Sequence, residues 1–185
     1  MSADIEDLTP KARRTRSALL DAARTELAQR GIDGVTVMAV CERASVGRTS
    51  FYNYFEDADA LVSTVAQETA IEIKDRFAIL HSDVPRGFVR LEACLRMILE
   101  TAADDPEAIL LVTSLSNSVP EIIELLHTEI SAELAAIASV PEEDRPALVS
   151  YLAQTVLGLA HQMALGNLTK NSIDRHIKFM MRACG

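Results

Sequence analysis

The stretch SVGRTSFYNYF at residues 45–55 decides the fold of this 185-residue chain, because it gathers four of the eight aromatic side chains beside several polar ones. The preceding TVMAVCERA at residues 36–44 has helical spacing, and the turn Ser45-Val46-Gly47 separates it from a second short helix. Neither helix is long enough to be stable alone, so both must be held by packing. The pattern predicts a helix-turn-helix.

Apolar side chains at compatible spacing are expected to hold the two short helices together: Val40, Ala44, Val46, Phe51 and Phe55. The polar side chains are left on the opposite face, which in a helix-turn-helix enters the major groove of DNA. Base contacts are expected from Arg48, Thr49, Ser50 and Asn53. Arginine can donate twice to guanine, asparagine can pair with adenine, and hydroxyl groups can donate or accept.

Phosphate contacts are expected from hydroxyl groups and from a backbone amide at a helix start: Thr36, Tyr52, Tyr54 and Gly47. A basic run on the preceding helix would reach the flanking backbone or the minor groove with Lys11, Arg13, Arg14 and Arg16. The net charge of the chain is −9, but residues 8–55 carry eight basic and only four acidic side chains. This local excess of positive charge suits DNA, whereas residues 56–185 are strongly acidic.

Several classes of protein are excluded by composition. No apolar run approaches the roughly 20 residues of a membrane-spanning helix, and the acidic start MSADIEDLTP does not resemble a secretory signal. We therefore expect a cytoplasmic protein with no membrane partner. Three cysteines and four scattered histidines lack metal-ligand spacing, so no metal is expected. No phosphate-binding loop or activated nucleophile is recognisable, so we expect neither a cofactor nor an enzyme.

Helical periodicity dominates the chain and predicts an all-α fold of about nine helices. The expected ranges are 10–30, 37–44, 48–54, 58–80, 86–103, 106–116, 120–138, 142–165 and 172–183. The alternation in GVTVMAV at 34–40 could suit a strand, but one strand without a partner is implausible. The tetrapeptide Ser-Val-Pro-Glu occurs at 118–121 and 139–142, where its serine could cap a helix and its proline could enter the first turn.

An ordered set of motifs resembles the DNA-binding domain of the TetR family of bacterial transcription regulators over residues 10–61. The set comprises LAQRG at 27–31, GVT at 34–36, ERASV at 42–46, FYNYF at 51–55 and DAL at 59–61. Two departures stand out: Ser45 and Gly47 exchange the family's usual turn glycine and capping serine, and Ala58 replaces a lysine that often contacts phosphate. Ser45 is expected to adopt a left-handed conformation.

The resemblance implies a helix-turn-helix domain at residues 1–57, followed by a larger helical effector-binding and dimerisation domain at 58–185. It also implies a homodimeric regulator, a ligand-released repressor, that binds a near-palindromic operator in double-stranded DNA. The small residues of 152–166 and the apolar stripe of Ile173, Ile177, Met180 and Met181 are expected to form the dimer interface.

An unknown small-molecule effector is expected among the long helices after residue 60, in a pocket with apolar walls and a few polar groups. The candidates are Gln67, Cys94, Met97, Ile98, Thr113, Leu126, His127, Gln154 and His161. Two other functions stay open at this point. One is a dimeric helical small-molecule-binding protein that has lost DNA binding, which Ala58 and the acidic balance favour; the other is a small helical enzyme.

Overall fold

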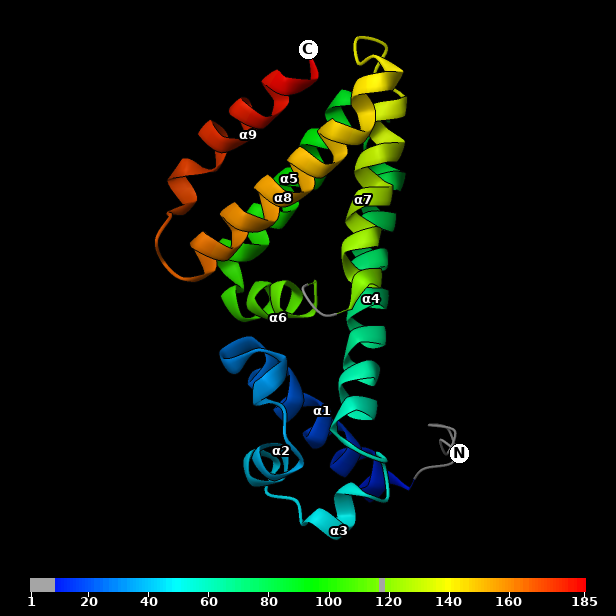
Figure 1. Cartoon of the computed structure of the whole chain (residues 1–185), viewed down its shortest axis with the longest axis vertical. Coiled ribbons are helices and arrows are strands. Elements are labelled where there is room, and N and C mark those ends of the chain that lie inside the picture. The colour runs from blue at the N-terminus through cyan, green and yellow to red at the C-terminus, as the bar shows by residue number, and fades with distance from the viewer. Residues whose placement is uncertain (1–8, 117–118) are drawn as a thin grey trace.

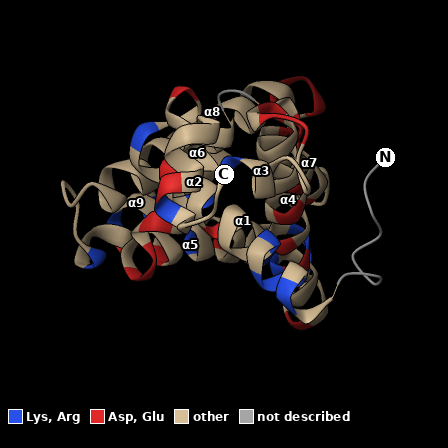
Figure 2. Ribbon diagram, turned by 90° about the horizontal axis from the view of Figure 1, so that it is seen from below, with Lys and Arg blue, Asp and Glu red and all other residues tan. Residues whose placement is uncertain are grey.

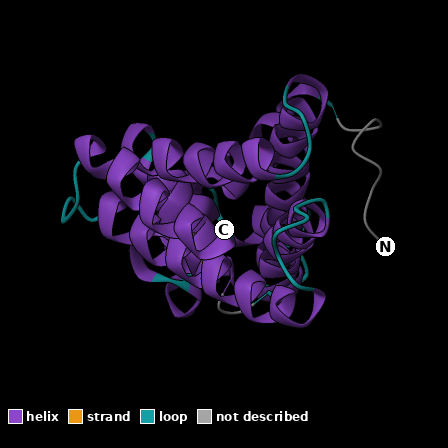
Figure 3. Ribbon diagram, turned by 90° about the horizontal axis from the view of Figure 1, so that it is seen from above, coloured by secondary structure: helices purple, strands orange, loops and turns teal. Residues whose placement is uncertain are grey.

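A computed structural model describes residues 9–116 and 119–185 of the chain. Within these residues all regular structure is helical (Figures 1 and 3). It comprises nine α-helices and four short 3₁₀ turns. The predicted all-α fold is confirmed. The helices form two parts: a small head of three helices, and a larger body that begins at Ala58.

The head contains α1 (Pro10–Arg30), α2 (Val37–Ala44) and α3 (Arg48–Phe51). Threonine hydroxyl groups cap the N-termini of α1 and α2. The Thr9 hydroxyl accepts from the backbone N–H of Ala12, and the Thr36 hydroxyl accepts from the backbone N–H of Ala39. α3 is shorter than predicted, because the chain leaves the helix after Phe51 and forms a turn over residues 52–54. The 3₁₀ turn Ile32–Gly34 joins α1 to α2, and residues 34–40 form no strand.

The turn between α2 and α3 has the conformation expected from the sequence. Ser45 lies in the left-handed region with φ of 54° and is the one non-glycine residue with positive φ in the part of the chain described. Its N–H donates to the carbonyl of Glu42, and the N–H of Val46 donates to that of Cys41, so the end of α2 is closed by backbone hydrogen bonds. Gly47 occupies the N-cap position of α3 and provides no side-chain hydrogen bond there.

The core of the head is built on the predicted residues. Phe51 is fully buried, Val40 and Phe55 are also buried, and Ala44 and Val46 pack against the same cluster. The rings of Phe51 and Phe55 lie 5.8 Å apart. Leucines from α1 join this core, and the body adds residues of α4, α6 and α7 to it: Leu61, Val62, Val65, Ala66, Leu111, Leu115 and Ile122. The head is therefore packed against the body as well as within itself.

The body contains α4 (Ala58–Asp83), α5 (Phe88–Asp104), α6 (Pro106–Ser116), α7 (Pro120–Ala135), α8 (Arg145–Ala164) and α9 (Ile173–Met181), with the 3₁₀ turns Glu142–Asp144, Lys170–Ser172 and Arg182–Cys184. In Figure 1, α4 runs from the head along α7, and α6 lies across the junction above α1. α8 and α9 lie on the side of the bundle away from α4. A second apolar core, from Phe77 to Cys184, fills the body.

Two predicted helix boundaries are wrong near the Ser-Val-Pro-Glu tetrapeptides. α7 ends at Ala135 rather than 138, and residues 142–144 form a 3₁₀ turn before α8 begins at Arg145. Ser139 does not cap a helix, because its hydroxyl donates to the carbonyl of Cys184 at 3.2 Å. Ser118, the capping candidate of the first tetrapeptide, lies outside the described residues. Pro120 of the same tetrapeptide is the first residue of α7, as expected.

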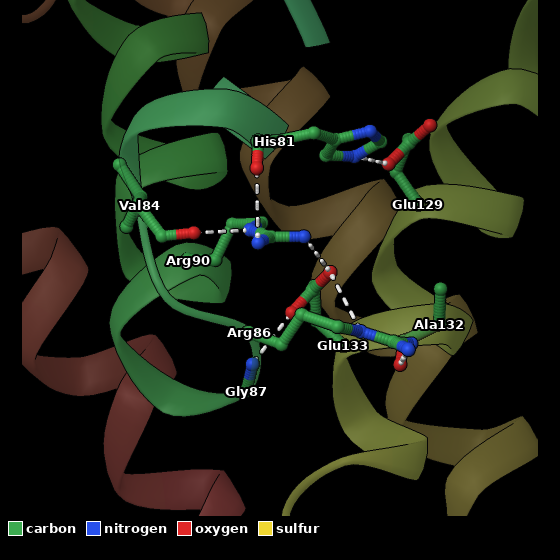
Figure 4. A network of polar contacts seen from close by, with 8 residues as sticks. All are labelled: His81, Val84, Arg86, Gly87, Arg90, Glu129, Ala132 and Glu133. Carbon is green, nitrogen blue, oxygen red and sulfur yellow. Dashed lines mark hydrogen bonds and ion pairs between the residues drawn. The ribbon is translucent and has the colours of Figure 1, made fainter. Parts of the chain in front are cut away.

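The corner between α4 and α5 is tied to α7 by a buried carboxylate (Figure 4). Glu133 is 1% exposed; it accepts from the N–H of Gly87 at 2.6 Å and lies 3.4 Å from the guanidinium of Arg90. Arg90 also donates to the carbonyls of Val84 and His81, at 2.7 and 3.2 Å. Gly87 has φ of 91°, which glycine adopts without strain. One carboxylate thus fixes the far end of α4.

No single helix in the described part of the chain is long and apolar enough to cross a membrane. α6 and α7 reach that length and composition only when taken together, and they are bent by 104° relative to each other.

Candidate nucleic-acid interface and effector cavity

The helix-turn-helix presents a polar face opposite its buried aromatic core. Arg48, Thr49 and Asn53 are exposed, and Ser50 is partly buried. Phe51 points into the core, so the neighbouring positions of the helical turn face outward. This accounts for the placement of all four side chains. The structure therefore brings the predicted base-contacting residues together on one accessible surface.

The predicted phosphate-contacting groups flank that surface. Tyr52 is 58% exposed, Thr36 and Gly47 are exposed, and Tyr54 is partly buried against the head core. The hydroxyl of Thr36 accepts from the N–H of Ala39, and its O–H stays available to donate to a phosphate oxygen. Met38, 60% exposed, lies beside Thr36 at the start of α2 and was not among the predicted contacts.

The eight basic residues of positions 8–55 divide into two groups. Four form ion pairs within the protein: Arg16, Arg24, Arg30 and Arg43. The other four are exposed, and no carboxylate of residues 9–116 or 119–185 lies within 4.0 Å of them: Lys11, Arg13, Arg14 and Arg48. Figure 2 shows basic residues gathered on the part of α1 nearest the N-terminus. The positive charge available to DNA is therefore concentrated at the start of α1 and at Arg48.

Arg16 is placed differently from the rest of the predicted basic run. Its guanidinium lies 3.4 Å from Glu68 of α4 and 5.7 Å above the centre of the Phe55 ring. The side chain is only 19% exposed. Arg16 thus connects α1 to α4, whereas the side chains of Lys11, Arg13 and Arg14 are exposed.

A buried carboxylate sets the position of α2 on α1. Glu26 of α1 is 2% exposed and accepts from Nε of Arg43 at 2.7 Å, while Arg30 lies 3.2 Å from its other oxygen. Arg43 also donates to the side chain of Gln29 at 3.1 Å. Because α2 carries α3 on a short turn, this clamp also orients the polar face. Glu26 could not be singled out from the sequence, because its spacing from Arg43 carries no local signal.

A cavity of about 420 Å³ lies at the junction of head and body. Its walls come from α1, α4, α5, α6, α7 and α8. Just over half of the lining residues are apolar: Ile73, Phe77, Met97, Ile98, Ala108, Ile109, Leu111, Val112, Ile122, Leu126 and Leu157. Of the nine predicted effector contacts, the structure places Met97, Ile98 and Leu126 in these walls. The volume and the apolar lining suit a small organic molecule.

The other six predicted contacts lie outside the lining. Gln67 and Gln154 are exposed, and Cys94 is buried in the body core, where burial raises the pKa of its thiol to about 12. Thr113 and Nδ1 of His161 form a hydrogen bond of 3.2 Å between α6 and α8. Nε2 of His127 is buried and has no hydrogen-bond partner among the described residues.

Polar groups at the cavity come from residues that the sequence analysis did not single out. The head contributes Asp21, Arg24 and Thr25 of α1, and the body contributes Glu72 and Arg76 among others. Thr101, also in the lining, accepts from Arg76 at 3.1 Å. A molecule in this cavity would therefore lie between the head and the body.

Among the described residues, no group of three or more His, Cys, Asp or Glu side chains could hold a metal ion. The three cysteines are buried and form no disulfide.

Known proteins share both the head and the whole fold. Residues 19–65 match the family model described as bacterial regulatory proteins, tetR family. A TetR-like transcriptional regulator from Rhodococcus sp. RHA1 superimposes with a TM-score of 0.76 at 16% identity, over 96% of each chain. A TetR family regulator from Marinobacter aquaeolei VT8 gives a TM-score of 0.72 at 19% identity, covering 94% of this chain and 96% of that one.

A third similar structure is the fatty acid degradation regulator FadR from Bacillus halodurans, with a TM-score of 0.69 at 15% identity over 96% of each chain. At these identities the structures establish only the fold. The family assignment rests on the match of residues 19–65 to the family model. Residues 19–65 thus carry the DNA-binding helix-turn-helix of the tetR family of bacterial regulatory proteins, and the described chain has the fold of TetR-like transcriptional regulators. Regulators of this family are transcription factors and not enzymes.

Proposed function

We propose that this protein is a homodimeric repressor, working in the cytoplasm, that binds a near-palindromic operator and is released from it by a small molecule. Residues 1–57 would read DNA, and residues 58–185 would bind the effector and form the dimer. The observation that carries the proposal is the exposed polar face of α3, which projects from a buried aromatic core and carries an arginine free of internal ion pairs with described residues.

In this proposal the base-reading groups are Arg48, Thr49, Ser50 and Asn53. Arg48 would donate to O6 and N7 of a guanine, and Asn53 would pair with an adenine. Phosphates would be held by Thr36, Tyr52, Tyr54 and the N–H of Gly47, and by the exposed side chains at the start of α1. Since these positive charges are few, the operator affinity should depend on base contacts as well as on salt.

The proposed dimer uses α8 and α9. The predicted stripe of Ile173, Ile177, Met180 and Met181 is wrong as an interface, because all four side chains are buried in the core of their own protomer. Large apolar side chains are exposed on these helices and on the residue that follows α8, with Tyr151 48%, Leu165 53% and Phe179 57% exposed. Gly158 is exposed between them on α8, and a Cβ added there would meet no atom within 4 Å. Small residues at such a position let the helices of two protomers approach closely. Two heads related by a two-fold axis then require two related half-sites.

The proposed effector is an apolar or amphipathic molecule that enters the cavity at the junction. The apolar lining favours this class. Two of the similar structures are described as a fatty acid metabolism regulator and a fatty acid degradation regulator, which agrees with an apolar ligand. A ligand releases DNA only if it binds the released arrangement of the heads more tightly than the DNA-bound one.

The DNA-binding part is tested by selecting duplexes from a random-sequence library with the purified protein. The expected product is a near-palindromic sequence that binds at least about 10³-fold more tightly than unrelated duplex, with an affinity that falls steeply between two salt concentrations. Recovery of no common sequence would instead favour a helical binding protein that has lost DNA recognition.

The dimer is tested with Gly158→Glu. Because the added side chain has space within its own protomer, each chain should stay folded, and a buried charge should separate the protomers. Sedimentation should show monomers with unchanged helical circular dichroism, and affinity for the selected operator should fall sharply. Ser150→Glu, at another exposed position of α8, is the matched control for added charge. An intact Gly158→Glu dimer would show that this face does not form the interface.

A further inference from the structure

Two side chains at the junction between head and body, Arg24 and Glu72, belong both to the effector cavity and to the ion pairs between α1 and α4. Arg24 of α1 lines the cavity, and its guanidinium lies 3.1 Å from Glu68 and 3.1 Å from Glu72, both on α4. It also lies 3.5 Å from the hydroxyl of Thr69, which is 3% exposed. Arg16 adds a second contact to Glu68 at 3.4 Å.

An apolar core joins α1 to α4, and Arg24 adds the polar contacts between the two helices beside the cavity. Glu68 and Glu72 are four residues apart, so they lie on the same face of α4 and repel each other unless a cation lies between them. Arg24 supplies that cation from the other helix. Its side chain is 23% exposed and that of Glu72 is 60% exposed, so solvent weakens the pairs and little energy is needed to rearrange them.

An occupant of the cavity would touch both partners of this contact. Arg24 and Glu72 are both in the lining, together with Asp21 and Thr25 of α1. The binding energy of such an occupant therefore changes whenever α1 moves relative to α4. That difference in binding energy is what coupling between two sites requires.

We propose that Arg24 is the positioning residue through which occupancy of the cavity reaches the DNA-reading head. An occupant displaces the Arg24 guanidinium from Glu72, and α1 then shifts on α4 and carries α2 and α3 with it. The inference rests on the proposed ligand-released repressor and adds the side chain that transmits the signal.

Arg76 provides a matched comparison within the same cavity. It also lines the cavity, but its hydrogen bond to a described residue goes to Thr101 on α5, inside the body. Loss of Arg76 removes a polar contact from the cavity without touching the contact between α1 and α4. If cavity chemistry alone mattered, the two arginines would behave alike.

The cavity can be filled covalently, so the test does not need the natural effector. Met97→Cys places a thiol in the lining, and N-phenylmaleimide then adds an apolar ring to it. The native cysteines are buried, and burial raises the pKa of the thiols of Cys41, Cys94 and Cys184, which leaves them protonated at neutral pH. The unmodified chain treated with the same reagent controls for labelling at these positions.

The measured quantity is the ratio of operator affinities before and after labelling, taken within each variant so that changes in basal affinity cancel. In Met97→Cys we expect labelling to weaken operator binding about tenfold or more, within the usual range of coupling between sites. Adding Arg24→Gln should reduce that ratio to less than about threefold, and adding Arg76→Gln should leave it unchanged. Arg24→Lys should keep part of the effect, because one positive charge stays between the glutamates.

The outcomes separate this inference from the function on which it rests. Equal ratios in Met97→Cys with and without the added Arg24→Gln change would overturn the inference while leaving ligand-controlled release intact. A ratio near one in Met97→Cys itself would overturn both. If Arg24→Gln does not fold, Glu72→Gln removes one of the two pairs at an exposed position, and an unchanged ratio there would equally contradict the proposal.

Discussion

The two ends of α4 are held in opposite ways. At the far end, Glu133 is 1% exposed and accepts a backbone N–H and an arginine, and that arginine, Arg90, is only 11% exposed. At the head end, Arg24 joins Glu68 and Glu72 across partly exposed ion pairs. A buried charge that loses its partner is costly, whereas exposed pairs contribute little. In its polar contacts the helix is therefore firmly fixed where it meets α5 and α7 and adjustable beside the cavity, while Leu61 and Val65 also pack it into the head core.

This difference suits a regulator that must move a DNA-reading domain without unfolding the ligand-binding one. The buried contacts of Glu133 keep the α4–α5 corner and α7 together, so the body can retain its shape (Figure 4). The weaker contacts lie beside the cavity, where a small molecule can compete with them. Motion is thereby expected at the junction and not within the body.

The largest expected effect comes from breaking the fixed end. Glu133→Ala leaves Arg90 largely buried without its carboxylate and removes the acceptor for the N–H of Gly87, so the free energy of unfolding should fall by about 3–5 kcal/mol. Urea denaturation monitored by circular dichroism measures this loss. A fall below about 1 kcal/mol would mean that the buried carboxylate does not fix the corner.

A smaller effect is expected at the adjustable end. Arg24→Gln removes two partly exposed ion pairs and should lower the free energy of unfolding by only about 1 kcal/mol. Its influence should appear instead in operator binding when the cavity is filled. A stability loss as large as that of Glu133→Ala would contradict the contrast between the two ends.

The smallest effect is expected for a control on the same helix as Glu133. Glu129 lies one turn earlier on α7 and contacts Nε2 of His81 at 2.7 Å, but that histidine is 41% exposed. Glu129→Ala should therefore change the free energy of unfolding by less than about 1 kcal/mol in the same urea assay. Comparison with Glu133→Ala separates the effect of burial from the effect of charge.

The head could be predicted closely from the sequence because its signals are local. Thr36 at the start of α2, Phe51 and Phe55 in the core and the left-handed Ser45 all follow from residues close together in the chain. Arg16 and Glu26 are exceptions, since their partners Glu68 and Arg43 are 52 and 17 residues away and no spacing rule connects them.

The cavity could not be predicted to the same extent because its walls come from six helices. Met97 and Ile98 share one helix and were found together with Leu126, whereas Arg24 lies in a segment assigned wholly to the head. Polar residues such as Gln154 have no periodic signal that separates a cavity from the surface. Which side chains meet in a cavity depends on how helices cross, and that is set by packing of the whole domain.

The most direct test of the account is the base-resolved specificity of the head. Binding of the selected operator and of every single-base-pair variant should be measured for the unmodified protein and for Arg48→Ala. The account predicts that Arg48→Ala weakens specific binding by about 1–3 kcal/mol and removes the preference at one base pair in each half-site, while preferences elsewhere persist. An unchanged specificity profile would contradict the claim that the exposed face of α3 reads DNA.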